Sequence, residues 1–472
     1  MKPESSGSSV GPERPPGDPQ GFLAFPEGAG EACPDGEAGP QGPAAWKEQR
    51  LKTAHLMEEV VSDANVTRAL KGVQANKGSP GVDGMTVEKL PGYLREHWPA
   101  LRAKLLEGTY EPAPVLRRTI PKSGGGKREL GIPTVLDRLI QQAILQVLEP
   151  IFDPTFSESS YGFRRGRSAH EAMRQAKRYI EEGYGWVVDV DLDKFFDRVH
   201  HDILMSRVAR RVGDKRLLHL IGAYLRAGVM VEGVVHEREE GTPQGGPLSP
   251  LLANILLDEF DRELESRGHR FCRYADDCNI YVRSKRAGER AMASVRAFLE
   301  KRLRLKVNEA KSAVARPSER KFLGFSITNH SPWKIRIAPK ALESARERIR
   351  TLTRRTRGVR LERVIADLNV FLRGWVGYFR LAQTPSVIED VEKWVRRRLR
   401  SLLWKQWKRG HARYRHLVEL GLPRWRARRL AGAGSGPWRM ARVLNSAIPP
   451  AYFVARGLLG LTDLYRQARL AT

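Results

Sequence analysis

The most constraining feature of this sequence is a pair of adjacent aspartates, Asp276 and Asp277, within the apolar and aromatic residues of segment 270–282. Such a segment predicts a β-hairpin that carries both carboxylates at its turn. Two like charges at one tight turn repel each other unless a cation lies between them. Hard Mg²⁺ prefers carboxylate and phosphate oxygens. The pair alone is more typical of a solvated Asp-rich turn than of a metal site, and the rest of the chain reverses that preference.

A second group of carboxylates lies upstream, in residues 186–197. Residues 187–192 alternate apolar and acidic side chains, which predicts a strand. Asp189 and Asp191 then point to one strand face, about 6–7 Å apart. Because unpaired buried carboxylates are costly, an ordinary core strand would not carry them. Packed beside the hairpin, this strand would complete a site for two metal ions about 3.5–4 Å apart, as phosphoryl transfer uses.

A Gly/Pro-rich segment at residues 241–250 lies between the two acidic elements and precedes an apolar run. Glycine allows the backbone to approach a ligand closely. The apolar run predicts a buried helix. By itself the pattern indicates a loop before a core helix, but its position favours a contact with a template or a nucleotide.

These elements occur in a recognisable order: Asp191, then Pro-Gln-Gly at residues 243–245, then Tyr-Ala-Asp-Asp at residues 274–277. The order resembles the reverse transcriptases and, more narrowly, the bacterial group II intron-encoded reverse transcriptase/maturase family. Further matching segments are residues 78–86, 120–134, 137–142, 160–167, 322–325 and 371–379. The resemblance implies an α+β fold: a right-hand polymerase with fingers and a palm around an antiparallel sheet, followed by an α-helical thumb/maturase domain and a basic helical C-terminal region.

The resemblance also implies the catalytic residues. Asp191, Asp276 and Asp277 match the family's carboxylates that hold two Mg²⁺ ions, and Asp189 is the weaker candidate. The primer 3′-OH would attack the α-phosphate of a template-paired dNTP without a protein nucleophile. Positioning and charge stabilisation would then do most of the work.

Five further positions match family residues that contact the incoming dNTP: Lys122, Arg128, Phe196, Gln244 and Lys311. Phe196 would crowd the sugar 2′-OH and exclude ribonucleotides, which disfavours an RNA-dependent RNA polymerase, although a core phenylalanine fits the same pattern. Lys122 and Arg128 flank a glycine-rich turn that equally resembles an exposed basic hairpin. Gln244 would pack near the incoming base and sugar, and Lys311 would assist pyrophosphate departure.

The charge distribution indicates a nucleic-acid partner. The formal net charge is +28, with −5 in residues 1–45 and +33 in the remainder. Residues 331–430 hold 27 Lys/Arg and 8 Asp/Glu, a net charge of +19. One basic run would be a solvated helix face, but a sustained excess interleaved with aromatic residues predicts a polyanion-binding surface. More than half of those aromatics should be core, with a few free to stack on bases. The residues predicted to contact RNA are Arg354, Arg355, Arg373, Trp375, Arg396, Arg397 and Arg398.

The predicted organisation has five parts: a disordered Gly/Pro-rich tail at 1–45, an N-terminal helical extension at 46–110, fingers and palm at 111–330, the thumb/maturase (X) domain at 331–388, and a basic DNA-binding region at 389–472. The tail departs from the family pattern, in which the chain usually begins near residue 50. The chain ends without the Cys/His-rich nuclease domain of some relatives, which resembles the compact class IIC branch.

Cysteine usage and hydropathy exclude some classes of site. Cys33, Cys272 and Cys278 form no CxxC pair, so neither a zinc site nor a disulfide framework is indicated. Cys272 and Cys278 flank the acidic hairpin and are predicted to be buried thiols. No apolar run reaches about 18 residues, so no membrane span is expected. The His-His-Asp sequence at residues 200–202 predicts a helix start rather than a metal site.

The sequence therefore predicts an RNA-directed DNA polymerase that uses an RNA template, a DNA primer or target, dNTPs and two Mg²⁺ ions, and that binds its intron RNA to promote splicing and mobility. Its expected location is the bacterial cytoplasm, near the nucleoid. Two alternatives remain open: a splicing-only maturase with an inactive polymerase fold, and a related reverse transcriptase recruited to host defence or repair. The three carboxylates favour an active polymerase.

Overall fold

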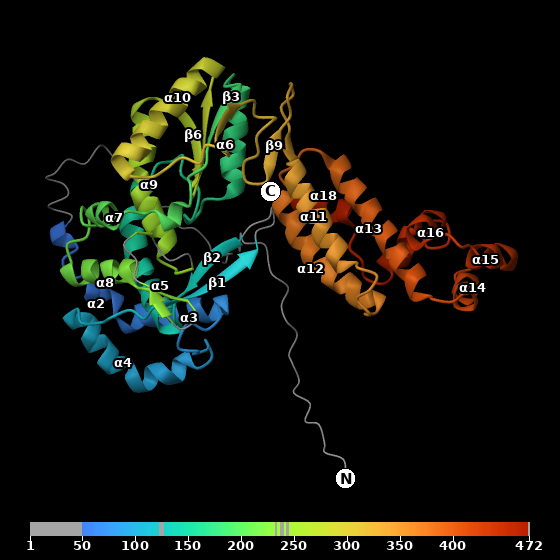
Figure 1. Ribbon diagram of the computed structural model, residues 1–472, viewed down its shortest axis with the longest axis horizontal. Helices are drawn as coiled ribbons and strands as arrows, with labels where there is room; N and C mark the ends of the chain where they lie inside the picture. Colours follow the sequence, from blue (N-terminus) through green and yellow to red (C-terminus); the bar gives the residue numbers. More distant parts are fainter. Residues whose placement is uncertain (1–49, 122–126, 232–233, 237–239, 242–244, 471–472) are drawn as a thin grey trace, which may run out of the picture. The chain divides into compact units, whose positions relative to one another are not determined.

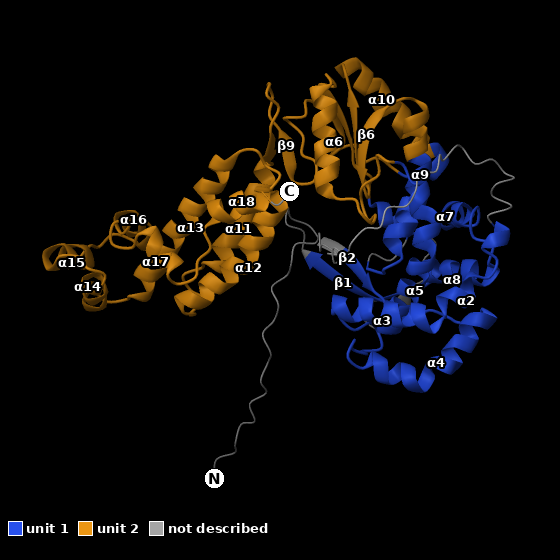
Figure 2. Ribbon diagram, turned by 180° about the vertical axis from the view of Figure 1, so that it is seen from behind, with its two compact units in different colours: residues 1–157, 194–260, 301–305 blue, residues 158–193, 261–300, 306–472 orange. Residues whose placement is uncertain are grey.

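The computed structural model describes residues 50–121, 127–231, 234–236, 240–241 and 245–470, with the side chains of these residues except at positions 121, 127–128, 231 and 234–236. The chain forms two compact units, which Figure 2 shows in different colours. The first comprises residues 1–157, 194–260 and 301–305, and the second comprises residues 158–193, 261–300 and 306–472. The tail predicted at residues 1–45 lies outside the described residues.

The first unit combines helices with a four-stranded sheet (Figure 1). Its helices are α2 (Leu56–Val60), α3 (Asp63–Asn76), α4 (Leu90–Glu107), α5 (Val135–Phe152), α7 (His201–Val208), α8 (Lys215–Arg226) and the first part of α9 (Ser249–Ser266), with short 3-10 turns at Asp153–Thr155 and Phe195–Asp197. The helix start predicted at residues 200–202 is confirmed, because His200 is the N-cap of α7.

The sheet of the first unit has the order β2-β1-β4-β5. Its strands are β1 (Val115–Pro121), β2 (Lys127–Ile132), β4 (Val229–Val231) and β5 (Val234–His236). The β1–β4 pair is parallel, and the other two pairs are antiparallel. The buried helix predicted after the Gly/Pro-rich segment is α9, whose residues 251–257 are all buried.

The second unit begins with an antiparallel sheet of order β6-β7-β3-β8. Its strands are β3 (Trp186–Val190), β6 (Arg270–Tyr274), β7 (Asp277–Val282) and β8 (Ala313–Ala315). Helix α6 (Ala169–Glu181) contacts β6 and β7, and α10 (Lys285–Phe298) contacts β3, β7 and β8. Gly288 lets α10 approach closely, since a Cβ there would collide with Val314. The predicted α+β class and antiparallel sheet are confirmed.

A strand pair, β9 (Phe325–Ile327) with β10 (Ile335–Ile337), leads into the C-terminal helices of the second unit. These are α11 (Pro339–Leu352), α12 (Leu361–Phe379), α13 (Pro385–Gln406), α14 (Gly410–Glu419), α15 (Arg424–Ala431), α16 (Pro437–Val443), α17 (Pro450–Val454) and α18 (Leu461–Leu470). No helix in the described part of the chain is both long and apolar enough to cross a bilayer.

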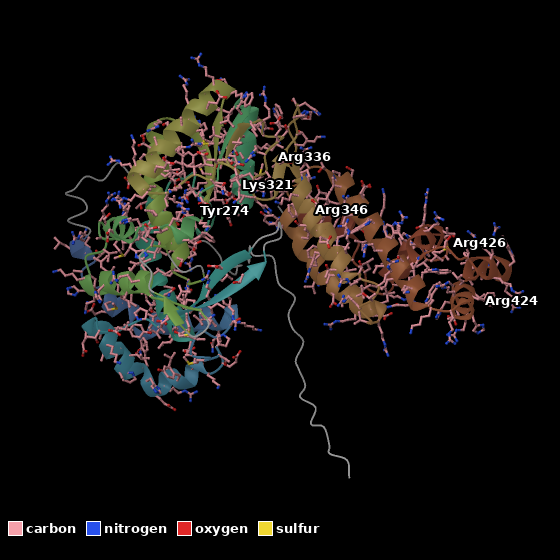
Figure 3. All side chains as sticks on the ribbon, in the orientation of Figure 1. Tyr274, Lys321, Arg336, Arg346, Arg424 and Arg426 are labelled. Carbon is pink, nitrogen blue, oxygen red and sulfur yellow. The ribbon has the colours of Figure 1, made fainter. Side chains whose placement is uncertain are left out.

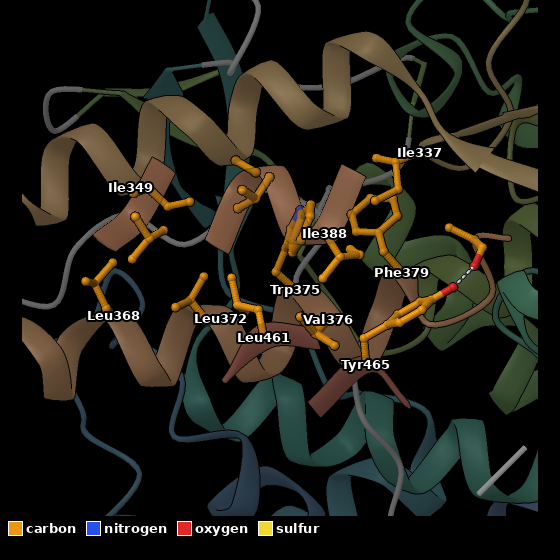
Figure 4. Close-up of a cluster of buried hydrophobic side chains, with 14 of the residues drawn as sticks. Ile337, Ile349, Leu368, Leu372, Trp375, Val376, Phe379, Ile388, Leu461 and Tyr465 are labelled. Atoms are coloured by element: carbon orange, nitrogen blue, oxygen red, sulfur yellow. Dashed lines mark hydrogen bonds between the residues drawn. The ribbon is translucent and has the colours of Figure 1, made fainter. Parts of the chain in front are cut away.

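A hydrophobic core joins the strand pair to these helices, and Figure 4 shows its centre. Ile349 of α11 and Ile388 of α13 are fully buried against α12, where Leu368 and Leu372 are also fully buried. The Tyr465 hydroxyl of α18 donates a hydrogen bond to the Ala382 carbonyl. Apolar residues at helical spacing on each element produce this core, because each helix has one face to bury.

Candidate active site

The acidic pair lies on the hairpin formed by β6 and β7. The strand register pairs Tyr274 with Asp277, so Ala275 and Asp276 form a two-residue loop. Ala275 has a φ of +57°, and two-residue hairpin loops favour a positive φ because it matches the twist of the strands. The predicted hairpin is confirmed. Asp276 occupies its turn, and Asp277 begins β7.

The upstream carboxylates lie beside this hairpin, as the sequence predicts. Strand β3 pairs antiparallel with β7, with Val190 opposite Cys278, so continuation of the register places Asp191 opposite Asp277. Hydrogen bonds of the Asp191 backbone hold the end of β3 in place. The Asp191 amide donates to Ser312 Oγ at 3.0 Å, and the Asn308 amide donates to the Asp191 carbonyl at 2.8 Å.

The four carboxylates influence one another electrostatically. Burial, followed by the negative charges of Asp276, Asp189 and Asp191, raises the pKa of Asp277 to about 7. Burial also raises the pKa of Asp189, although Arg320 opposes that shift. The sheet therefore gathers more negative charge than its neighbouring cations neutralise.

Two cations make different contacts with these carboxylates. Arg320 donates from Nε and Nη2 to Asp189 Oδ2, at 2.8 and 2.6 Å. Lys311 Nζ lies 3.1 Å from Asp191 Oδ1 and 3.4 Å from Asp191 Oδ2, and its side chain is 63% exposed. A metal ion would displace an exposed lysine from a carboxylate more easily than an arginine that donates two hydrogen bonds to it. Asp191 is therefore more available than Asp189 for a metal ion.

Within the described residues, no three acidic, histidine or cysteine side chains already surround a common point closely enough to hold an ion. The donor set nevertheless fits a hard divalent cation, because oxygen ligands and uncompensated negative charge are what such an ion requires. Binding at Asp191 would replace the Lys311 ammonium. The raised pKa of Asp277 agrees with this, because the charges of three neighbouring aspartates add to the effect of its burial.

The same pKa shift predicts how metal-free stability depends on pH. The raised pKa means that folded Asp277 holds its proton more tightly than the unfolded chain does. Its contribution to stability is therefore present below pH 4 and is lost as the pH rises through about 7. In EDTA we expect the free energy of unfolding to fall between pH 5 and pH 8, with about 3 kcal/mol of the fall from this group.

Asp277→Asn should flatten this pH profile, measured by urea unfolding in EDTA. The matched control is Asp390→Asn, because the Asp390 side chain is 69% exposed. A slope that is identical in the natural protein and Asp277→Asn would contradict the assignment of this pKa.

The predicted dNTP contacts are only partly described. Lys122 and Gln244 lie outside the described residues, and so does the Arg128 side chain. Phe196 belongs to a 3-10 turn of the first unit, next to Phe195. Phe195 is buried, whereas Phe196 is half-buried with its ring 5.1 Å from that of Phe195. Of the two rings, Phe196 therefore keeps more surface for a ligand.

Of the six arginines predicted to contact RNA, three are exposed and three are half-buried. Figure 3 shows basic side chains all along the C-terminal helices, among them the labelled Arg346, Arg424 and Arg426. Arg354, Arg355 and Arg373 are exposed. Arg396, Arg397 and Arg398 are half-buried and have partners within the chain: Glu392, the Trp438 ring and Thr353, respectively.

The prediction that Trp375 contacts RNA needs a correction. Trp375 is 8% exposed and packs in the helical core, with its ring 5.4 Å from that of Phe379 (Figure 4). No ring face is left for a base. Trp404 and Trp407 are also buried, so the core takes most of the aromatic residues of this basic region, as predicted.

A buried ion pair beside the hairpin was not predicted from the sequence. Arg273 of β6 is fully buried and donates from Nε and Nη2 to the carboxylate of Asp261, at 2.7 and 2.5 Å. Its Nη1 also donates to the Ala275 carbonyl in the hairpin loop at 3.0 Å, and Nη2 donates to Ser160 Oγ at 2.8 Å. The only sequence signal for this ion pair was an arginine inside a mostly apolar strand. Its side-chain partners, Asp261 and Ser160, lie too far along the chain for a local pattern to show them.

The other predicted features near the hairpin agree with the structure. Cys272 and Cys278 are free, buried thiols, as expected for residues that flank the turn. Burial raises the pKa of both thiols, which keeps them protonated and unreactive.

Comparison with known proteins identifies two family models in the chain. The model described as reverse transcriptase (RNA-dependent DNA polymerase) matches residues 120–327. The model described as group II intron, maturase-specific domain, matches residues 342–421. The first match covers Asp191, Asp276 and Asp277, and the second covers the basic helices α11 to α14 almost completely.

The similar proteins differ in how much of their length is shared. Protein YkfC of Escherichia coli (strain K12) is 35% identical over 320 residues, which are 59% of this chain and 83% of YkfC. The group II intron-encoded protein LtrA of Lactococcus lactis subsp. cremoris is 39% identical over 195 residues, 41% of this chain and 32% of LtrA. A solved chain titled partial Cas6-RT-Cas1--Cas2 complex is 27% identical, covers 52% of this chain and 42% of that one, and has a TM-score of 0.35, too low to bear on the fold. The long match to YkfC, together with the two family models, shows that this chain belongs to the reverse transcriptase family, in the group that carries a group II intron maturase-specific domain.

Proposed function

We propose that the protein adds dNTPs to a primer 3′-OH on an RNA template, with Asp191, Asp276 and Asp277 as the residues that hold two Mg²⁺ ions. The observation that carries this proposal is the group of carboxylates at the adjoining ends of β3 and the β6–β7 hairpin, where the register places Asp191 opposite Asp277. Burial, and then the charges of the neighbouring aspartates, raise the pKa of Asp277 to about 7. Bound ions would supply the charge that activates the hydroxyl and stabilises the transferred phosphoryl group.

The remaining roles belong to the chain's own side chains. Lys311 holds Asp191 in the protein alone and would turn to the triphosphate when Asp191 binds an ion, which agrees with a role in pyrophosphate departure. Arg320 fixes Asp189 and donates to the Lys311 carbonyl, so it holds the loop that carries Lys311. Lys122, Arg128 and Gln244 are proposed to contact the dNTP.

We further propose that the basic helices bind intron RNA and promote its splicing and mobility, as the maturase-specific model and the intron-encoded relative suggest. Arg354, Arg355 and Arg373 are the best placed of the predicted contacts, because they are exposed. The five-part organisation predicted from the sequence remains a proposal, with DNA binding assigned to residues 389–472. A net charge of +28 suits a protein that stays with nucleic acid in the bacterial cytoplasm, near the nucleoid.

The test is primer extension on an RNA template with dNTPs and Mg²⁺, with an Asp276→Asn/Asp277→Asn variant for comparison. Extension by the natural protein that is lost in the variant supports the polymerase. Absence of extension by both proteins, together with tight RNA binding and accelerated intron splicing, would establish the splicing-only alternative instead. A third role, in host defence or repair, would be supported if extension succeeds but no intron RNA is bound preferentially.

Phe196 provides a separate prediction about the choice of sugar. If its half-buried ring crowds the 2′-OH, Phe196→Ala should reduce the preference for dNTPs over rNTPs by about tenfold or more, measured as the ratio of kcat/KM values. Phe195→Leu is the control, because Phe195 is buried in the protein core. An unchanged ratio in Phe196→Ala would show that another residue excludes ribonucleotides.

A further inference from the structure

We infer that Phe163 is a contact for the end of the primer–template duplex: its ring, held beside Tyr274, packs against the terminal base pair and positions the primer 3′-OH. This inference rests on the proposed function. Phe163 belongs to the segment Ser-Tyr-Gly-Phe-Arg-Arg at residues 160–165, to which neither the carboxylate site nor the basic helices assign a role.

The backbone of Phe163 is in an uncommon conformation. Its φ is +58°, and a bulky residue rarely adopts the left-handed region because its Cβ crowds the following carbonyl. Despite this conformation, the side chain does not fill the core: Phe163 is 44% exposed. Its ring centroid lies 6.4 Å from that of Tyr274, at the end of β6. A strained residue that leaves its ring at the surface indicates a constraint other than core packing.

The surrounding structure holds Phe163 in this position from both sides. Before it, Ser159 to Tyr161 run along β6: the Arg273 amide donates to the Ser159 carbonyl and the Tyr161 amide donates to the Arg273 carbonyl, both at 2.8 Å. After it, the buried Arg164 donates from Nη1 to the Ser160 carbonyl at 3.1 Å. The segment therefore cannot relax the strain by moving away from the strand.

Gly162 connects this segment directly to the catalytic hairpin. A Cβ at position 162 would collide with the backbone of Ala275, the residue that precedes Asp276. The same Arg273 that donates to the Ala275 carbonyl also donates to Ser160 Oγ. Phe163 and the acidic pair are thus carried by two backbone segments that are in contact and share one buried arginine.

The position of Phe163 beside the acidic hairpin indicates which part of the nucleic acid its ring would contact. If Asp276 and Asp277 hold the ions that activate the primer hydroxyl, the terminal base pair must lie within a few ångströms of the hairpin. An exposed ring packed against Tyr274 of that hairpin then meets the terminal sugar and base. Aromatic contacts to nucleic acid are tolerant of sequence, because every base has a flat face. Such tolerance suits a polymerase whose primer end changes with each nucleotide added.

The test uses Phe163→Asn, because asparagine tolerates a positive φ and removes only the ring. We expect the KM for a primer–template duplex to rise by about tenfold, because the variant loses one aromatic stacking contact. The KM for dNTP should stay constant. The thermal midpoint should change by only a few degrees, since strain relief offsets lost packing. Phe163→Tyr should restore the KM. The control is Leu51→Asn, which changes a 72% exposed apolar residue of the first unit.

A second readout separates this inference from the proposed function. A duplex with 2-aminopurine as the terminal primer base should change its fluorescence on binding to the natural protein, and Phe163→Asn should abolish that change without dNTPs or Mg²⁺. If the natural protein fails to extend primers but this signal depends on Phe163, the proposed polymerase fails and the contact stands. If Phe163→Asn matches the natural protein in both KM and fluorescence, the inference is overturned.

Discussion

Asp191→Asn should lower primer extension by at least about 10³-fold, because it removes a proposed ligand of the metal ions that would stabilise the charge developed during phosphoryl transfer. The variant should be at least as stable as the natural protein when metal is absent. Asp191 is one of the charges that raise the pKa of Asp277, so its removal relieves repulsion. Lys311 loses its partner, but its side chain is exposed and the ion pair contributes little. Single-turnover extension and urea unfolding in EDTA measure the two effects.

Asp189→Asn is the matched comparison for this prediction. Asp189 lies two residues earlier, within β3, and is engaged by Arg320. We therefore expect Asp189→Asn to lower extension by about tenfold at most, with a loss of stability. The assignment of Asp191 over Asp189 would be wrong if the two variants exchanged these behaviours. It would also be wrong if Asp191→Asn kept a tenth of the natural rate.

Arg273→Met should destabilise the protein by about 3–5 kcal/mol, because it leaves the carboxylate of Asp261 buried without its cation. Both side chains are fully buried in the natural protein. The change in the free energy of unfolding is measured with urea. The control is Arg466→Met, since the Arg466–Asp463 pair is exposed and should contribute less than about 1 kcal/mol.

The double variant Arg273→Met/Asp261→Leu separates stability from positioning. Replacing both charges with apolar side chains should recover most of the lost stability. It does not restore the donor to the Ala275 carbonyl or to Ser160 Oγ. Primer extension should therefore stay about tenfold below the natural rate in a protein that is well folded. Full recovery of both stability and extension would mean that the ion pair only stabilises the fold.

The local elements of the site were predictable because their signals are local. The alternation around Asp189 and Asp191 and the two runs around Asp276 specify a strand and a hairpin, and both form as predicted. The family resemblance supplied their meaning. It also supplied positions whose roles the fold alone does not test, such as Lys122 and Gln244, which lie outside the described residues.

Two kinds of feature were not predictable. The first is pairing across distance: Arg320 with Asp189 and Arg273 with Asp261 join residues from separate segments, and charge alone does not select the partner. The second is burial within a mixed composition. The basic helices must bury one apolar face, and Trp375 lies on it, so an aromatic residue in a cationic region was assigned to RNA when it belongs to the core.

The interleaving of the two units has a consequence for synthesis of the chain. Strand β3 pairs only with β7 and β8 among the described strands, and about 90 residues separate it from β7. At 5–20 residues per second, a ribosome needs about 5–20 s to produce that partner. During this time both edges of an apolar strand are unpaired and open to other chains. The nascent protein should therefore depend on chaperones most strongly between the emergence of β3 and that of β7, before either unit is complete.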